Sequence, residues 1–235
     1  KTWELAKMID HSILNPAMTD DDLIRECMIA MKYNVASVCV KPYAIKQAVS
    51  LLKGSDVMTG CVIGFPHGNS STRVKVFEAE QACIEGAVEI DMVINIGKAL
   101  GGDWQYVENE IKEVTDICHK HAAIVKVIFE TDYITRTEDK IKLCEICTRA
   151  GADFVKTSTG YGFVKQSDGT YNYKGATIDD IRLMRKYSGP GVQVKCAGGV
   201  RTLDDLLAMK EAGATRSGAT ATAAMIDEAK RRFGE

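Results

Sequence analysis

Three lysines and one aspartate lie in the middle of short, strongly apolar segments. The segments read VEIDMVIN, IVKVIFE, DFVKTS and VQVKCAG, and the charged residues in them are Asp91, Lys126, Lys156 and Lys195. Strands of a parallel sheet covered by helices are almost continuously apolar, so a charge at such a position needs a reason. Because side chains alternate along a strand, the flanking valines should face the helices while the four charged groups face inward and meet.

Such a cluster suits nucleophilic catalysis by an amine. A lysine with a pKa near 10.4 has only about 0.04% free amine at neutral pH, and lowering its pKa to about 7 takes about 4.6 kcal/mol. A second ammonium about 5 Å away supplies roughly 3 kcal/mol of this at an effective dielectric constant near 20, and burial can supply the rest. Two lysines on adjacent strands are therefore a device for activating one of them.

Lys156 and Lys195 are the best pair for this chemistry. Each ends a strand and is followed by small, polar or glycine residues, namely 157–160 and 196–199. In parallel α/β folds the carboxyl ends of the strands form the active-site face. A network of structural salt bridges, or a different strand register, is the alternative explanation; Asp10, Glu89 and Glu130 could add acidic groups to either arrangement.

Two glycine-containing loops predict an anion-binding site beside the lysines. Gly198 and Gly199 precede a helix, and residues 216–220 lead into the last helical segment. Backbone N–H groups and helix N-termini in such loops bind phosphate. A phosphorylated substrate follows from the two loops together.

The elements that must position these residues alternate regularly along the chain. Short apolar runs and amphipathic runs of helical length predict eight β/α units, and Gly-Ala pairs close three of the helices. The expected strands are Met8–Leu14, Ala36–Lys41, Met58–Phe65, Val88–Asn95, Ile124–Glu130, Phe154–Ser158, Val192–Ala197 and Thr215–Gly218. The expected helices are Asp20–Tyr33, Tyr43–Leu52, Ser71–Glu85, Trp104–His121, Glu138–Ala150, Ile178–Tyr187, Leu203–Ala212 and Ala221–Arg232. We expect an α/β protein in which residues 1–235 form a single (β/α)8 (TIM) barrel with parallel strands, and the long connection Gly160–Thr177 should lie over the site.

Composition and charge exclude several classes of partner. The 235 residues are 46% hydrophobic and 26% charged with a net charge of −2, so there is no basic surface for nucleic acid. No apolar run is long enough to span a membrane, and the first residues lack the layout of a secretory signal. We expect a cytoplasmic protein that acts on a small molecule. A homodimer is one assembly that this protein could form.

The cysteines and histidines do not suggest a metal site. The eight cysteines are scattered through apolar segments, which predicts buried free thiols. Cys144 and Cys147 form a C-x-x-C pair with no second pair to complete a zinc site, and His67, His119 and His121 do not complete a ligand set.

Taken together, the motifs resemble those of the deoxyribose-phosphate aldolase family, class I lyases of the (β/α)8 fold. The matching segments cover nearly the whole chain: DHS, SVCVKP, GFPHG, EIDMVIN, KVIFET, VKTSTGY, VKCAGGVRT and GATRSGAT. The chain departs from the family where it has Arg216-Ser-Gly-Ala-Thr instead of the usual R-[IL]-G-[TA]-S, so the hydroxyl donors of this loop differ.

The resemblance implies a role for each residue of the site. Lys156 would be the Schiff-base lysine, Lys195 the cation that lowers its pKa, and Asp91 the carboxylate that moves protons. The residues implied to bind or line the substrate pocket are Ser12, Cys39, Lys126, Thr159, Gly160, Gly198, Gly199, Ser217 and Gly218.

The implied reaction is the reversible cleavage of 2-deoxy-D-ribose 5-phosphate to D-glyceraldehyde 3-phosphate and acetaldehyde. It needs no metal or other cofactor, because the iminium formed on the lysine is the electron sink. Two alternatives stay open from the residues alone: a pyridoxal-phosphate enzyme that uses the same lysine, and a non-catalytic sugar-phosphate sensor.

Overall fold

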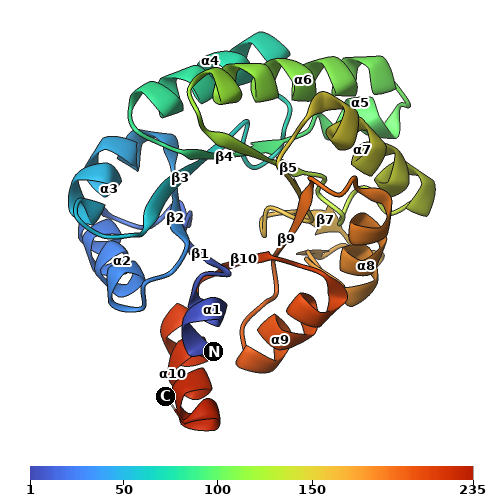
Figure 1. Cartoon of the computed structure of the whole chain (residues 1–235). Helices are drawn as coiled ribbons and strands as arrows, with labels where there is room; N and C mark the ends of the chain where they lie inside the picture. Colours follow the sequence, from blue (N-terminus) through green and yellow to red (C-terminus); the bar gives the residue numbers. More distant parts are fainter. Residues whose placement is uncertain (235) are drawn as a thin grey trace.

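Eight parallel strands close into a barrel in the computed structural model, which describes residues 1–234 (Figure 1). Neighbouring strands around the barrel follow the order β1-β10-β9-β6-β5-β4-β3-β2. The strands are β1 (Ile9–Ile13), β2 (Ser37–Val40), β3 (Met58–Ile63), β4 (Glu89–Val93), β5 (Ile124–Ile128), β6 (Phe154–Lys156), β9 (Gln193–Ala197) and β10 (Arg216–Ala219). The predicted (β/α)8 fold is therefore confirmed, and all eight predicted strands are present.

Helices surround the barrel and connect successive strands (Figure 1). They are α1 (Thr2–Ala6), α2 (Asp20–Lys32), α3 (Ile45–Leu52), α4 (Thr72–Ile84), α5 (Ile96–Leu100), α6 (Trp104–Lys120), α7 (Thr137–Ala150), α8 (Ile178–Tyr187), α9 (Leu203–Ala212) and α10 (Thr222–Phe233). A 3-10 turn, Pro42–Ala44, precedes α3. The glycines that end α7 and α9, Gly151 and Gly213, have positive φ angles of 78° and 114°, the left-handed conformation that closes a helix before a strand.

The side chains of the strands alternate as predicted. The outward-facing valines are fully buried in the apolar core that strands and helices share; they are Val125, Val127, Val155 and Val194. The register pairs Asp91 with Lys126 across β4 and β5, and Lys156 with Lys195 across β6 and β9. The strands thus place the charged side chains at neighbouring positions on the inner face of the barrel.

Two short helices and two short strands were not predicted. Helices α1 and α5 have only five residues each, too few for a helical period to show in the sequence. The connection Gly160–Thr177 contains a two-stranded antiparallel hairpin, β7 (Val164–Lys165) and β8 (Tyr171–Asn172), outside the barrel. Strands of two residues leave no alternating pattern to detect.

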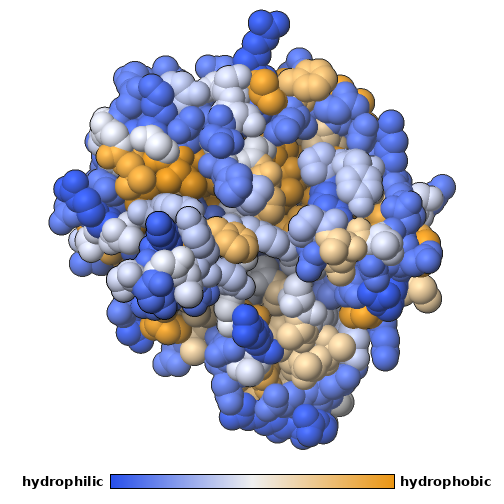
Figure 2. Space-filling view, turned by 180° about the vertical axis from the view of Figure 1, so that it is seen from behind, coloured by the Kyte–Doolittle hydropathy of each residue, from blue (hydrophilic) through white to orange (hydrophobic). Residues whose placement is uncertain are grey.

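The outer surface agrees with a mixed charged composition. In the space-filling view of the opposite face, hydrophilic side chains make up most of the outer rim and paler or apolar ones lie further in (Figure 2). The eight cysteines are free, and all but Cys83 are buried, as predicted. Within residues 1–234, no helix combines the length and hydrophobicity needed to cross a membrane.

Candidate active site

A cavity of about 420 Å³ opens at the carboxyl ends of β1, β2, β6, β9 and β10. Its lining consists of Ser12, Leu14, Asn15, Cys39, Lys156, Thr159, Gly160, Tyr161, Phe163, Tyr173, Lys195, Ala197, Gly198, Gly199, Val200, Arg201, Gly218, Ala219 and Thr220. A larger hollow of about 610 Å³ lies beside the hairpin, but neither Lys156 nor Lys195 lines it. We assign the site to the smaller cavity because it holds both lysines.

The two lysines at the inner end of the cavity share one carboxylate oxygen. Lys156 Nζ and Lys195 Nζ each donate to Asp91 Oδ2 at 2.7 Å. Lys195 Nζ also lies 2.6 Å from Asp10 Oδ2. The lysine side chains are only 3% and 1% exposed, so this contact is shielded from bulk water.

A second layer of charge lies beneath this pair. Lys126 Nζ donates to Asp10 Oδ2 at 3.0 Å and to Glu89, and it lies 3.2 Å from Asp91 Oδ1. Arg216 donates to both Asp10 and Glu89. The layer makes a continuous chain of ion pairs from the cavity into the barrel interior.

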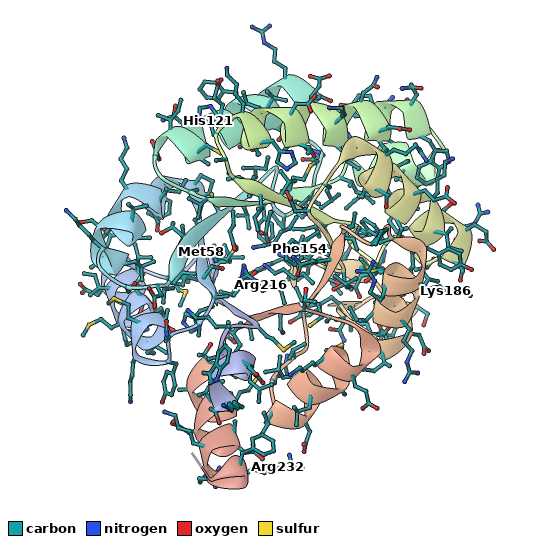
Figure 3. All side chains as sticks on the ribbon, in the orientation of Figure 1. Met58, His121, Phe154, Lys186, Arg216 and Arg232 are labelled. Atoms are coloured by element: carbon teal, nitrogen blue, oxygen red, sulfur yellow. The ribbon has the colours of Figure 1, made fainter. Side chains whose placement is uncertain are left out.

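The bottom of this chain is closed by a ring contact. The Arg216 guanidinium and the Lys126 ammonium lie 5.9 and 6.0 Å from the centre of the Phe154 ring. Phe154 is 3% exposed and Arg216 8%. In Figure 3 the labels of Phe154 and Arg216 lie inside the ring of strands. Side chains therefore fill the barrel below the lysines.

The charges of the buried cluster balance if Lys156 is neutral. The acidic members are Asp10, Glu89 and Asp91, and the other basic members are Lys126, Lys195 and Arg216. Within this network of ion pairs three carboxylates balance three cations without Lys156, and Glu130, the other buried carboxylate that interacts with Lys156, binds Thr159 instead. The arrangement therefore favours the free amine of Lys156.

The direction of each pKa agrees with this assignment. Burial lowers the pKa of Lys156, and Lys195 lowers it further, although Asp91 opposes both. Burial acts against the Lys195 ammonium too, but the Asp10 and Asp91 carboxylates outweigh it and raise the pKa of Lys195. Burial likewise disfavours the Asp91 anion, yet the three lysines around it hold its pKa well below the ordinary value. One amine is thus poised as a nucleophile beside an ammonium that can donate a proton.

Most of the predicted site residues come together at this cavity. Nine of them line it: Ser12, Cys39, Lys156, Thr159, Gly160, Lys195, Gly198, Gly199 and Gly218. Asp91 lies directly beneath, bound to both lysines. Lys126 is not among the residues that line the cavity, and its amine is held by three carboxylates in the second layer, so its binding to the substrate stays a prediction.

Ser217 also lies outside the cavity. It pairs with Cys196 in the barrel, and the residues before this pair, Arg216 and Lys195, both point inward. Alternation therefore turns Ser217 toward the helices, where it is fully buried. The hydroxyl-bearing residue of this loop that lines the cavity is Thr220.

The sequence analysis did not select Arg201 as a site residue. Among the residues that line the cavity it carries the only guanidinium, and it is exposed at the rim next to Gly198 and Gly199. Its place in the GGVR segment, two residues after Gly199, is a signal that could have identified it. A guanidinium beside backbone N–H groups is suited to a phosphate group.

Comparison with known proteins gives a consistent match over nearly the whole chain. Residues 5–225 match the DeoC/LacD family of aldolases. The chain is 49% identical to the deoxyribose-phosphate aldolase of Rhodopirellula baltica over 98% of this chain and 91% of that protein. It is 48% identical to the deoxyribose-phosphate aldolase of Thermococcus gammatolerans over 97% of each chain.

Solved structures agree with the sequence matches. An aldolase designated QR15 superimposes with a TM-score of 0.87 at 34% identity, over 97% of each chain. The tetrameric deoxyribose phosphate aldolase from Aeropyrum pernix superimposes with a TM-score of 0.86 at 27% identity, over 98% of this chain and 92% of that chain.

Proposed function

This chain belongs to the DeoC/LacD family of aldolases, and on that premise we propose how its residues carry out the reaction. The activity is that of a deoxyribose-phosphate aldolase, which cleaves 2-deoxy-D-ribose 5-phosphate reversibly to D-glyceraldehyde 3-phosphate and acetaldehyde. We therefore favour the aldolase activity over the two alternatives, a pyridoxal-phosphate enzyme and a non-catalytic sugar-phosphate sensor. From the geometry of the cluster we assign a separate role to each buried charged group.

Lys156 is the nucleophile in this proposal. Its neutral amine attacks C1 of the open-chain sugar, and the carbinolamine loses water to give a protonated imine. A water molecule takes the proton of the C3 hydroxyl as the C2–C3 bond breaks, and the electron pair of that bond moves into the iminium to form an enamine. The C3 carbon leaves as the aldehyde of glyceraldehyde 3-phosphate.

Lys195 and Asp91 move protons around Lys156. The Lys195 ammonium can protonate the carbinolamine hydroxyl as it leaves, and Asp91 Oδ2, which accepts from both amines, can return a proton between them. Protonation of the enamine at C2 and addition of water to the imine then release acetaldehyde and restore Lys156.

The phosphate is placed at the outer end of the cavity. Gly160, Gly198 and Gly199 offer backbone there, and Arg201 supplies a positive charge, whereas Gly218 lies deeper, next to the Lys195 side chain. This places the sugar aldehyde at the inner end beside Lys156, because the two ends of the substrate then match the two ends of the cavity.

The contact that carries the proposal is the sharing of Asp91 Oδ2 by the two lysine amines. Borohydride reduction in the presence of acetaldehyde should add a two-carbon group to Lys156, found by mass mapping of peptides. Lys156→Ala should lose this label and nearly all turnover. A label on Lys195 or Lys126 instead would overturn the assignment.

We also propose that the protein acts in the cytoplasm as a homodimer. Exposed apolar side chains on one stripe of α4, Val74, Phe77 and Ile84, support contact with a second copy. Light scattering on the purified protein tests this assembly, and a monomer at micromolar concentration would contradict it.

A further inference from the structure

One wall of the cavity is formed by a segment that leaves the barrel between β6 and α8, which we call the excursion. Residues 159–176 leave the barrel after β6 and return before α8, and their outer part is the β7–β8 hairpin. We call residues 159–163 the outgoing stem and residues 173–176 the returning stem. Tyr161, Phe163 and Tyr173, from the two stems, line the cavity, so the position of the stems determines the shape of this wall.

The outgoing stem is held by a buried carboxylate from the loop after β5. Glu130 accepts hydrogen bonds from Thr159 N at 3.2 Å and from Thr159 Oγ1 at 2.5 Å. Thr159 Oγ1 in turn accepts from Tyr161 N at 2.9 Å. Glu130 has a φ of 58°, a left-handed conformation that is rare for a residue other than glycine, and the side chain is buried.

Two more residues of the same loop hold the excursion at other points. Asp132 accepts from Lys174 N at 2.5 Å and from Gly175 N at 3.1 Å, which fixes the returning stem. Tyr133 Oη donates to the carbonyl oxygen of Phe163 at 2.8 Å. The loop after β5 therefore holds both stems by hydrogen bonds.

The returning stem is packed against a glycine expected to bind phosphate. Ala176 N donates to the carbonyl oxygen of Gly198 at 3.0 Å. A Cβ added to Gly175 would lie 2.5 Å from that same oxygen, so only glycine allows this approach. A movement of the returning stem would therefore displace Gly198 as well.

We propose that Glu130, Asp132 and Tyr133 are positioning residues for the phosphate end of the cavity. By holding both stems they set the place of Gly160 on one side and of Gly198 on the other. None of the three lines the cavity, so they act through the backbone that they bind. The inference rests on the proposed function, since it takes the phosphate of the substrate to lie at those glycines.

The test compares two substrates that differ only in the phosphate. For Asp132→Ala we expect kcat/KM for 2-deoxyribose 5-phosphate to fall about tenfold, mainly through KM, because two backbone N–H groups lose their acceptor. For 2-deoxyribose it should change less than about twofold, because the lysine end is untouched. Tyr133→Phe removes one hydroxyl with little risk to folding and should shift the same ratio in the same direction by a smaller factor.

A matched control lies at the tip of the same hairpin. Asp168 accepts hydrogen bonds from Thr170 and contacts neither stem, so Asp168→Ala should leave the preference for the phosphorylated sugar unchanged. Equal losses for both sugars, or an unchanged ratio in Asp132→Ala and Tyr133→Phe, would overturn the inference.

The acetaldehyde label separates this inference from the function on which it rests. If wild type and variants all carry the label on Lys156 but the sugar preference does not move, the positioning role is wrong. If wild type does not carry the label, the proposed function itself is wrong.

Discussion

Replacing Lys195 with leucine tests the electrostatic activation of Lys156. Both amines lie 2.7 Å from the same atom, Asp91 Oδ2, so the two nitrogens are separated by about 5 Å at most. At an effective dielectric constant near 20, two ammonium groups at this separation repel each other by about 3 kcal/mol. Removing that repulsion lowers the fraction of free Lys156 amine roughly a hundredfold at pH values below the pKa. It also frees Asp91 to hold the Lys156 ammonium more strongly, which acts in the same direction.

The assay is the pH dependence of kcat/KM, together with the rate of imine trapping by acetaldehyde and borohydride. Because the pKa of Lys156 rises in Lys195→Leu, the rising limb of both profiles should move to higher pH. Lys195→Arg keeps the charge with a different shape, so its limb should stay near that of the wild type even if the rate falls. A loss of rate in Lys195→Leu with no movement of the limb would refute the reasoning and would leave Lys195 as a proton donor only.

Two further predictions concern the phosphate end and the outer barrel wall. Arg201→Ala should lower kcat/KM for 2-deoxyribose 5-phosphate about tenfold or more, because a charge-assisted contact with the phosphate is lost. The value of kcat/KM for 2-deoxyribose should not change. Steady-state kinetics with both sugars test this prediction. His11 is buried between Thr222 Oγ1 at 2.7 Å and Glu26 Oε2 at 2.8 Å, and burial lowers its pKa. The folded state then binds fewer protons than the unfolded state, so stability should be lost as the pH falls below about 6.5, at up to about 1.4 kcal/mol per pH unit. Urea unfolding at several pH values should show a flatter dependence for His11→Gln; identical slopes for both proteins would contradict it.

The inward charges could be predicted because each broke an apolar pattern. Asp91, Lys156 and Lys195 stood out against strands that otherwise needed no polar group, and alternation alone placed them on one face. The same rule, applied to β10, would have turned Ser217 outward once Arg216 was known to point inward. The register of this short strand was not evident from its polar sequence.

Other parts of the site depend on contacts that no local pattern reveals. Glu130 and Asp132 were visible as acidic residues, but their partners lie 29 and 42 or 43 residues further along the chain. Arg216 was grouped with a phosphate loop and instead closes the barrel interior against Phe154. Long-range pairing of this kind is set by barrel closure, which composition and periodicity do not encode.

In the proposed mechanism, the depth of the cavity determines the order in which the two products depart. Lys156 lies at the buried inner end, above an interior filled by the charged cluster and Phe154, while Arg201 stands exposed at the rim. With Lys156 as the nucleophile, the two-carbon fragment is still bonded to it after the carbon–carbon bond breaks, and glyceraldehyde 3-phosphate with its phosphate at the rim would occupy the path to solvent. The phosphorylated aldehyde therefore leaves first and acetaldehyde last. In the direction of synthesis the sequence reverses, so acetaldehyde is the obligatory first reactant and the acceptor aldehyde closes the entrance behind it.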